Sequence, residues 1–544
     1  MRKPWSKWIY FVLLLMGLWS VNACHTQAQI ERPNPLEQDS FIQVYFNHNQ
    51  AKGADYTEPY RSMKRGGDNL EQILIDNVNS ATSMIDIAVQ ELRLPNLAKA
   101  IVKKTDEGVK IRLILENTYN SPIRQLTTTE LDNLEEREAE RYESYFAFID
   151  VNKDGKLSSQ ELSDRDAIFI LKQGKINIID DTEDGSKGTG LMHHKFMVID
   201  QKKVITGSPN FTMSDVHGDF DNPETRGNAN NLLTINSAPL ADIFTKEFNQ
   251  MWGDGVGGEK DSKFGINKLQ RSPKTLTIGD SKMTVKFSPN SATNNWEITS
   301  NGLIGNTLNQ AKNSINLALF VFSEQKLANI LEEKNNQGVS IKALIDPQFA
   351  YRNYSEALDL LGVALSNKCK YELDNKPWQK AINTVGIPNI PDGDKLHHKF
   401  GIIDDNIIIT GSHNWSNSAN TQNDETLLII KNPTITAHYL REFKRLYQDA
   451  ILGIPDFVNK KIKQEQEKCS EVSAPVSVEK SQELVNVNTA SLEQLMTLPG
   501  IGEKLAQRII EARQEKSFTS LQDLTRVKGI GNSKLKKLEN KITL

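Results

Sequence analysis

The chain has 544 residues, of which 38% are hydrophobic and 25% are charged, and its formal net charge is -4. This length exceeds that of one ordinary domain, about 100–200 residues, so we expect two to four folded units. The composition excludes a chain that is disordered throughout and a polytopic membrane protein. The near balance of charges excludes a uniformly basic nucleic-acid coat, so a site for a polyanion must be a local patch.

Residues 1–23 have the pattern of an export signal. A basic start precedes an apolar run at residues 8–19 and then a small-residue site before Cys24. Twelve apolar residues fall short of the roughly 20 that span a bilayer, so the pattern favours a cleaved signal peptide over a transmembrane anchor. Cys24 also stands where a bacterial lipoprotein carries its lipid, and lipidation and plain cleavage after Ala23 both stay open. We expect an exported bacterial protein that is periplasmic, extracellular or lipid-anchored at the cell envelope.

An internal repeat covers most of the chain. The segment 81–88 recurs at 311–318, an offset of 230 residues. In both copies a β-rich run, a helical stretch and a second apolar run follow one another, which is β-α-β order and predicts a parallel sheet. We therefore expect two α/β lobes, at residues 40–270 and 275–455, that form one pseudo-symmetric unit.

The first lobe carries an insertion at about residues 125–175, because the repeat offset falls to 204 between His193 and His397. Within it, segment 150–161 resembles an EF-hand calcium loop, with Gly155 at the sharp turn. The expected calcium ligands are Asp150, Asn152, Asp154, Ser158 and Glu161 with the backbone carbonyl of Lys156. A solvated acidic turn is the alternative. A single loop of this kind predicts weak, structural Ca²⁺ binding that braces the insertion and takes no part in catalysis.

The strongest feature is a motif of the form His-x-Lys-x4-Asp-x6-Gly-Ser-x-Asn, which occurs once in each lobe. In the first lobe it comprises His193, Lys195, Asp200, Gly207, Ser208 and Asn210. In the second lobe it comprises His397, Lys399, Asp404, Gly411, Ser412 and Asn414. These spacings resemble those of the phospholipase D superfamily.

The motif predicts how its side chains are presented. Residues 191–200 form an expected strand, so His193 and Lys195, two positions apart, project from the same face. Asp200 falls on the opposite face near a turn, and we expect it to be a structural carboxylate. The next strand delivers Ser208 and Asn210 beside the histidine, where hydroxyl, amide and backbone N–H groups can face a phosphate. The second lobe repeats this arrangement.

Two facing lobes gather two histidines, two lysines and two asparagines around one phosphorus. The resemblance implies phosphodiester hydrolysis through a phosphohistidine intermediate, with one imidazole as nucleophile and the other as acid. It implies that His193 is the nucleophile and His397 the acid, although the spacing does not force that order. The resemblance also implies that Lys195, Lys399, Asn210 and Asn414 stabilise the charge and that no metal is required. A zinc site is disfavoured, because adjacent histidines on a strand point apart.

A carboxylate on the other ring nitrogen would orient each histidine. The resemblance points to a glutamate downstream of the Gly-Ser-x-Asn element, and Glu425 fits this position. In the first lobe Asn230 aligns with Glu425, so the sequence departs from the family pattern there. Asn230 is either a counterpart of Glu425 or a simple loop residue. A real difference between the two positions would give the histidines different pKa values and distinct roles.

The C-terminal part differs from the lobes in composition. Residues 456–484 read as a polar linker, and residues 485–544 hold ten basic and six acidic residues. Two Gly-x-Gly turns lie between amphipathic helical patterns and resemble paired helix-hairpin-helix motifs of competence DNA receptors. The expected DNA contacts, which bind phosphate without reading bases, are Gly500, Ile501, Gly502, Lys504, Gly529, Ile530, Gly531 and Lys534. The alternative is a small all-α packing or protein-docking module.

The remaining cysteines, Cys369 and Cys469, lie far apart, so neither a disulfide framework nor a thiolate zinc site is indicated; they pair once or stay free. Together the motifs predict an exported phosphodiesterase that acts on DNA as a nuclease. The main alternative is a phospholipase D that converts phosphatidylcholine to phosphatidate, and a second is a non-enzymatic surface DNA receptor. Because both half-sites lie in one chain, we expect a monomer, with possible membrane contact through a lipidated Cys24.

Overall fold

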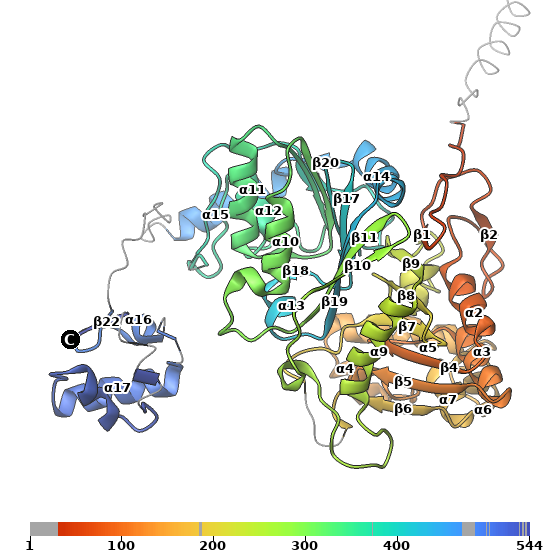
Figure 1. Cartoon of the computed structure of the whole chain (residues 1–544), viewed down its shortest axis with the longest axis horizontal. Coiled ribbons are helices and arrows are strands. Elements are labelled where there is room, and N and C mark those ends of the chain that lie inside the picture. The colour runs from red at the N-terminus through yellow and green to blue at the C-terminus, as the bar shows by residue number, and fades with distance from the viewer. Residues whose placement is uncertain are drawn as a thin grey trace, which may run out of the picture. The chain divides into compact units, whose positions relative to one another are not determined.

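The computed structural model describes residues 31–183, 188–372, 374–469, 485–496, 498–499, 501–531, 534–535, 538 and 541–544. The predicted signal peptide and Cys24 lie outside the described residues. The chain forms two compact units, Met1–Val472 and Ser473–Leu544 (Figure 1). Within the described ranges, no helix is both long and apolar enough to cross a membrane.

The first lobe contains a seven-stranded sheet in the order β1-β9-β8-β7-β4-β5-β6. Its strands are β1 (Ile42–Phe46), β4 (Met84–Val89), β5 (Lys110–Leu115), β6 (Asn177–Asp180), β7 (Lys195–Ile199), β8 (Lys203–Gly207) and β9 (Asn231–Asn236). Strands β4, β5 and β6 are parallel, as predicted, whereas β7, β8, β9 and β1 are antiparallel to their neighbours. The short β7–β8 turn can join only antiparallel strands, so the sheet is mixed.

The second lobe contains a nine-stranded sheet in the order β10-β11-β19-β17-β16-β12-β14-β15-β20. Its strands are β10 (Lys274–Ile278), β11 (Ser281–Ser288), β12 (Ser314–Leu319), β14 (Ser340–Ile345), β15 (Val385–Ile387), β16 (Lys399–Ile403), β17 (Ile407–Gly411), β19 (Glu425–Lys431) and β20 (Ile451–Leu452). The seven strands β11-β19-β17-β16-β12-β14-β15 occupy the same places in the second sheet as β1-β9-β8-β7-β4-β5-β6 in the first. The pseudo-symmetric α/β fold predicted from the repeat is confirmed.

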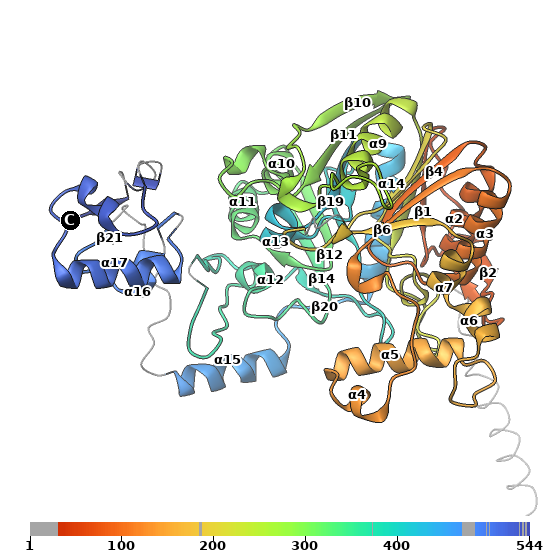
Figure 2. The ribbon, with the colours of Figure 1, turned by 90° about the horizontal axis from the view of Figure 1, so that it is seen from below.

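Each sheet has an outer helical layer and an inner face toward the other lobe (Figure 2). The outer helices are α2 (Leu70–Ser80), α3 (Pro95–Asp106) and α7 (Ala167–Gln173) in the first lobe and α10 (Ser300–Leu308), α11 (Gln325–Asn336) and α12 (Glu356–Leu360) in the second. Helices α9 (Ala238–Trp252) and α14 (Pro433–Gln448) lie between the sheets and share one hydrophobic core with the inner faces of both. This common core joins the lobes into one body.

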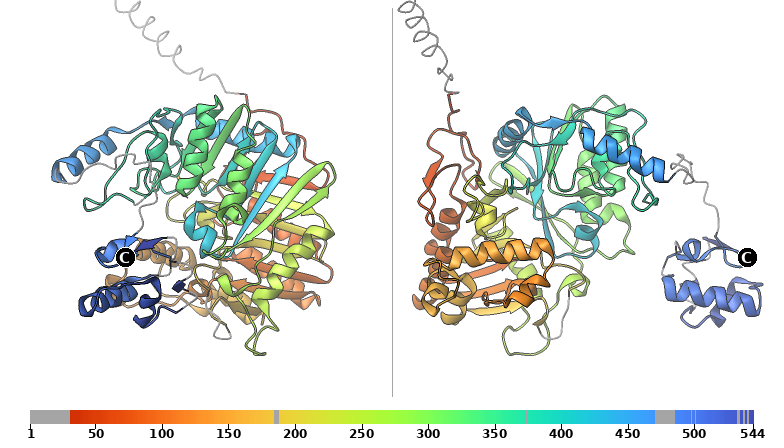
Figure 3. Two further views of the ribbon diagram at one scale, coloured as in Figure 1. Left: turned by 60° about the vertical axis from the view of Figure 1, so that its left-hand side comes forward. Right: turned by 180° about the vertical axis from the view of Figure 1, so that it is seen from behind.

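The insertion of the first lobe consists of α4 (Thr128–Asp132), α5 (Glu136–Ile149) and α6 (Ser159–Arg165), visible in Figures 2 and 3. Helix α5 ends with Phe148 and Ile149 buried in the outer core of the lobe. Near the middle of α5, Arg141 reaches Glu91, which follows β4, at 3.1 Å. Apolar burial and an ion pair therefore fix the insertion to the lobe.

The first part of the segment predicted as a linker is a helix. Segment 456–468 forms helix α15 (Asp456–Lys468), whose Val458 is buried in the core of the second lobe. Cys469 at its end forms a disulfide with Cys369. The polar composition of this helix suggested a linker because only a few apolar positions anchor it. The two cysteines therefore pair once, which is one of the two alternatives left by the sequence.

The C-terminal unit is helical around its own core, which consists mainly of leucine, isoleucine and valine side chains. It contains α16 (Leu492–Met496), α17 (Glu503–Glu515) and a 3₁₀ helix at Leu521–Arg526. A short parallel pair, β21 (Val485–Asn486) with β22 (Ile542–Thr543), joins the two ends of the unit. The module is thus mainly, but not entirely, helical.

Candidate active site

The two motif histidines are anchored by contacts that cross between the lobes. The backbone N–H of His193 donates to the carbonyl oxygen of Asp424 at 3.0 Å, and that of His397 donates to the carbonyl oxygen of Ala229 at 3.1 Å. Two short parallel bridges continue these contacts. The first residue of each motif is therefore hydrogen-bonded to the start of a strand in the opposite lobe. The two half-sites thus meet where the lobes join.

Glu425 orients the ring of His193. Its Oε2 lies 2.8 Å from His193 Nδ1, and the carboxylate is fully buried. The hydroxyl of Ser412 donates to the same oxygen at 2.7 Å and holds it against the ring. Because a carboxylate only accepts, Nδ1 carries the proton and Nε2 presents its lone pair. The glutamate expected at this position thus orients a histidine, and it is the histidine of the opposite lobe.

Asn230 takes the equivalent place beside His397. Its Oδ1 lies 3.0 Å from His397 Nδ1, and the hydroxyl of Ser208 donates to that Oδ1 at 2.7 Å. Asn230 is therefore a counterpart of Glu425 rather than a simple loop residue. The two serines were expected to face a phosphate; instead both are fully buried behind the histidines and support Asn230 and Glu425. One histidine contacts a charged partner and the other a neutral one.

The two lysines bring positive charge to the histidines. Lys195 Nζ donates to the carbonyl oxygen of His193 at 3.0 Å, and Lys399 Nζ donates to that of His397 at 2.7 Å. Both are buried, and in the described part of the chain neither makes a salt bridge with a carboxylate. Burial lowers the pKa of Lys195 to about 8 and lowers the pKa of Lys399 well below its usual value, helped by the charge of Lys195. Among the described residues, these two desolvated amines thus have no carboxylate within ion-pair distance.

The motif asparagines and aspartates have different surroundings. Asn210 and Asn414 are half-buried, and their side-chain carbonyl oxygens have no hydrogen-bond partner among the described residues. Asp200 begins the turn after β7 at φ 50°, and its carboxylate accepts three backbone N–H groups at the start of β4, including that of Met84. Asp404 does the same at the start of β12. The aspartates therefore tie strands together, whereas each motif asparagine has a buried side-chain oxygen that no described residue satisfies.

Three residues near the motif were not found by the sequence reasoning. Gln90 Oε1 lies 3.4 Å from Lys195 Nζ, and the ring of Phe320 lies 4.8 Å from Lys399 Nζ. The repeat offset of 230 relates these two positions, so a systematic comparison of the lobes would have paired them. The third residue, Asp215, is buried 3.5 Å from His397 Nδ1. It has no carboxylate counterpart in the second lobe, so the repeat gives no signal for it.

Burial and positive charge keep both imidazoles neutral. Desolvation lowers the pKa of His193 to about 4, although the charge of Glu425 raises it. Desolvation also lowers the pKa of His397 well below its usual value, and the charges of Lys399 and Lys195 lower it further. An anion bound among these four groups would oppose both causes, because its negative charge favours the protonated forms. The site is therefore suited to an anionic ligand whose negative charge raises the pKa of an imidazole, so that the imidazole takes up a proton when the ligand binds.

This linkage predicts that anion binding takes up protons. Sulfate is a suitable probe because it does not titrate near neutral pH, so every proton exchanged belongs to the protein. We expect its affinity for the full chain to rise about tenfold between pH 8.5 and 6.5, because Lys195, with a pKa of about 8, and His397, neutral when free, take up protons as the anion binds. Calorimetry in two buffers with different ionisation enthalpies measures the proton uptake directly. Proton release, or no exchange, would contradict the electrostatic account of the site.

The second histidine of each pair is structural. His194 Nδ1 lies 2.9 Å from Thr426 Oγ1 and its Nε2 lies 3.5 Å from Glu247, whereas His398 Nε2 lies 3.1 Å from Glu442. Both rings are fully buried. Across the described ranges, no group of three histidine, cysteine or carboxylate side chains could hold a metal ion. His194 and His398 thus lie in the buried core between the lobes, as the alternation of side chains along a strand predicts.

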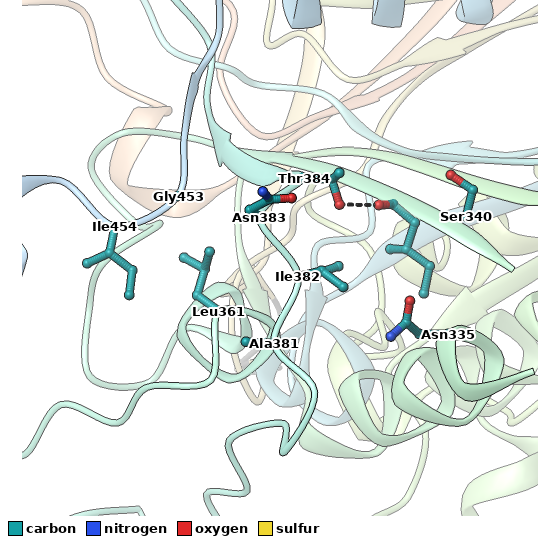
Figure 4. Close-up of a pocket in the computed structure, with 10 residues that line it drawn as sticks. Asn335, Ser340, Leu361, Ala381, Ile382, Asn383, Thr384, Gly453 and Ile454 are labelled. Carbon is teal, nitrogen blue, oxygen red and sulfur yellow. Dashed lines mark hydrogen bonds between the residues drawn. The ribbon is translucent and has the colours of Figure 1, made fainter. Parts of the chain in front are cut away.

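A pocket lies in the second lobe (Figure 4). Its volume is about 620 Å³, and it is lined by Asn335, Ser340, Ile341, Leu361, Ala381, Ile382, Asn383, Thr384, Gly453 and Ile454. Ser340 and Ile341 open strand β14, whereas the histidines lie near the other end of the parallel strands, where Asp346 accepts from the N–H of Leu396 at 2.8 Å. No charged side chain lines the pocket, so it offers no acid–base chemistry.

The expected calcium loop lies between α5 and α6. Gly155 adopts φ 75°, and the carboxylate of Asp150 accepts the backbone N–H groups of Asp154 and Gly155 at 3.1 and 2.9 Å. Glu161 accepts from the N–H and hydroxyl of Ser158 at 3.0 and 2.7 Å, which caps α6. The carboxylates of Asp150 and Glu161 thus accept hydrogen bonds from N–H and hydroxyl groups of the loop itself. Calcium binding stays a prediction.

The tandem hairpins of the C-terminal unit are described in part. Gly500 lies outside the described residues, as does the side chain of Lys504. Gly502 precedes α17, Gly529 adopts φ 109°, and Gly531 is exposed. The side chains of Ile501 and Ile530, expected to contact DNA, are instead buried in the core of the unit. These isoleucines anchor the hairpin turns, because an apolar side chain in each turn is drawn into the core, and Lys534 is half-buried.

Comparison with known protein families agrees with this geometry. The model described as "Cardiolipin synthase, PLD-like domain" matches residues 74–252 and 304–447, and a helix-hairpin-helix motif matches residues 480–543. The first model covers more than half of the chain. The chain therefore belongs to the phospholipase D-like family, in two lobes, and carries a C-terminal helix-hairpin-helix motif.

Individual relatives cover smaller parts. A mitochondrial cardiolipin hydrolase of Mus musculus is 28% identical over 141 residues, which cover 26% of this chain and 54% of the relative. The chain thus spans about half the length of the curated relatives it first matches. ComE operon protein 1 of Bacillus subtilis (strain 168) is 42% identical over 62 residues, which cover 11% of this chain and 30% of that protein. A phosphatidylserine synthase structure from Haemophilus influenzae Rd KW20 matches 81% of this chain and 94% of its own at 11% identity and a TM-score of 0.46.

Proposed function

We propose that this protein is a phosphodiesterase that hydrolyses DNA through a phosphohistidine intermediate. The observation that carries the proposal is the crossed pairing of two imidazoles, each held at Nδ1 by the opposite lobe, beside two buried lysines that form no ion pair with any described carboxylate. This arrangement leaves both Nε2 atoms for chemistry and places positive charge where a diester would lie. One chain supplies both halves, so we propose that it acts as a monomer.

We assign the nucleophile to His193. Its Nε2 attacks phosphorus, the bond to one ester oxygen breaks, and protonated His397 gives that oxygen its proton from Nε2. Water then attacks phosphorus while His397 takes its proton, the phosphorus–nitrogen bond breaks, and His193 recovers its lone pair. The imidazole gains positive charge when the phosphorus–nitrogen bond forms, and Glu425 at 2.8 Å is the only one of the two ring partners with a charge to balance it. The lysines and asparagines would stabilise the charge on the non-bridging oxygens.

DNA is the favoured substrate because the C-terminal unit is basic and carries the helix-hairpin-helix motif. Exposed glycines before α17 and at Gly531 would let a phosphate approach backbone N–H groups without base contacts. The similarity to the ComE operon protein adds support. A phospholipid diester is the second candidate, favoured by the names of the cardiolipin hydrolase relatives. A non-enzymatic DNA receptor is the third.

One substrate comparison tests these candidates. The full chain is incubated with plasmid DNA, single-stranded DNA, and vesicles of phosphatidylcholine or cardiolipin, all in the presence of EDTA. We expect DNA cleavage that EDTA does not stop, because the histidines and lysines perform the steps. Lipid turnover with intact DNA would replace the nuclease with a phospholipase. DNA retention without turnover of either substrate would replace the enzyme with a receptor.

We also propose that the chain is exported. The pattern of residues 1–23 supports this, and so does the disulfide between Cys369 and Cys469, since such bonds persist mainly in oxidising compartments. Lipidation at Cys24 would add a membrane anchor.

A further inference from the structure

A buried carboxylate, that of Asp215, lies next to both Asn230 and His397. Asp215 is 3% exposed, and its Oδ1 accepts from the amide of Asn230 at 3.2 Å and from that of Asn228 at 2.7 Å. The same Oδ1 lies 3.5 Å from His397 Nδ1. A negative charge is therefore present next to His397, although the residue in direct hydrogen-bond contact with the ring is neutral.

The orientation of the Asn230 amide is fixed by its neighbours. Its Oδ1 accepts from the hydroxyl of Ser208, and its Nδ2 donates to Asp215 and to the backbone carbonyl of Asn228 at 3.1 Å. A flipped amide would place Nδ2 against the Ser208 hydroxyl and Oδ1 against the Asp215 carboxylate. The carbonyl end therefore faces His397. The Asp215 carboxylate polarises the Asn230 amide, and this makes the amide oxygen a stronger acceptor for the imidazole N–H.

The second lobe has an alanine at the position equivalent to Asp215. Asp215 is the third residue after the N-cap of α8 (Met213–Val216), and Ala419 is the third after the N-cap of α13 (Asn417–Thr421). Both lie five positions after the motif asparagine, at Asn210 and Asn414. The first lobe thus combines aspartate at this position with Asn230, whereas the second combines alanine with Glu425. Each lobe holds one carboxylate for the opposite histidine, at different depths.

Asp215 also contacts the motif itself. Its Oδ2 accepts from the backbone N–H of Asn210 at 2.9 Å. Its charge raises the pKa of Lys195, which burial lowers to about 8. A single buried carboxylate therefore contacts Asn210 directly and lies close to His397.

We propose that Asp215 is a positioning residue of the reaction: acting through Asn230, it stabilises the protonated form of His397 and so prepares this histidine to protonate the leaving oxygen. Through Asn230, Asp215 stabilises the positive charge of His397 less than Glu425 stabilises that of His193 through a direct hydrogen bond. This difference separates the two histidines into acid and nucleophile. This inference rests on the proposed phosphodiesterase function.

The test compares leaving groups. Asp215→Asn is expected to lower kcat about 10²-fold on a thymidine dinucleotide, whose alkoxide needs protonation, and less than about threefold on bis(p-nitrophenyl) phosphate, whose phenolate does not. The double variant Asp215→Ala with Asn230→Glu reproduces the arrangement of the second lobe, and the alanine makes room for the longer side chain. We expect it to recover activity on the dinucleotide to within about tenfold of the native protein. Asp219→Asn, a nearby carboxylate bonded to Ser214 at 2.6 Å, is the matched control and should change neither rate.

A second readout separates this inference from the proposed function. In the full chain labelled with ¹⁵N-histidine and saturated with sulfate, the pKa of His397 should be lower in Asp215→Asn than in the native protein, whether or not any diester is hydrolysed. An unchanged pKa, equal losses on both substrates, or no recovery in the folded double variant would overturn the inference. Circular dichroism checks folding, and the double variant keeps a carboxylate in the network if Asp215→Asn does not fold. A native chain that hydrolyses no diester would defeat the proposed function alone.

Discussion

Replacing either His193 or His397 with alanine is expected to lower DNA turnover about 10⁴-fold or more, because each removes a group that forms or breaks a bond to phosphorus or its oxygen. The two variants should differ on bis(p-nitrophenyl) phosphate. His397→Ala should still form the covalent intermediate, because p-nitrophenolate leaves without an acid, and then stop before hydrolysis. His193→Ala should form no intermediate. Rapid-quench measurement of released p-nitrophenol and mass spectrometry of the protein distinguish the two.

The control for these variants is His438→Ala. His438 lies on α14, half-buried, and its Nε2 contacts the carbonyl oxygen of Glu37 at 2.9 Å, so its loss should leave turnover unchanged. A covalent adduct in His193→Ala but not in His397→Ala would reverse the assignment of nucleophile and acid. Appreciable DNA turnover in either variant would remove the paired-imidazole mechanism.

A chain that ends at Val472 is expected to keep full activity on bis(p-nitrophenyl) phosphate and to lose about 10² in affinity for DNA. The lobes form a compact unit up to this residue, the truncation retains the disulfide at Cys469, and the removed unit has its own hydrophobic core. Covalent linkage of a DNA-binding module to a catalytic unit raises the local concentration of substrate, which explains the size of the loss. Filter binding and steady-state kinetics measure the two quantities separately.

Salt dependence provides the control for the truncation. Binding through phosphate contacts falls steeply with salt, so the slope of affinity against salt concentration should become shallower without the C-terminal unit. Unchanged DNA affinity after truncation would assign the helix-hairpin-helix unit to another partner. Loss of activity on the small diester would show instead that the lobes need this unit to fold.

Much of the fold was predictable because the chain repeats. The offset of 230 residues located both lobes, and the spacing from His193 to Asn210 and from His397 to Asn414 identified both half-sites. The places of β9 and β1 in the mixed sheet were not predicted, since β-α-β order describes only the three parallel strands. Helix α15 was also missed, because a helix that buries only Val458 fully has nearly the composition of a linker.

The pairing across the site was beyond the sequence. The motif located Glu425 but gave no reason to place it on His193 rather than on the histidine of its own lobe. The predicted role of Ser208 and Ser412 was wrong for a related reason, since a hydroxyl that a strand delivers beside a histidine can face either the ligand or the residue behind it. Asp215 was missed because its aligned partner, Ala419, has no polar group, so comparison of the lobes pointed away from it.

The crossed bridges, Met192 with Asp424 and Ala229 with Leu396, make each half of the chain dependent on the other for its chemistry. A fragment that held a single lobe would retain its own histidine and lysine but lose the side chain that fixes the imidazole tautomer. Loosening the contact between the lobes would disable both imidazoles at once. Catalytic activity should therefore report on interlobe docking and disappear in one step when the halves separate, even where each sheet is still folded.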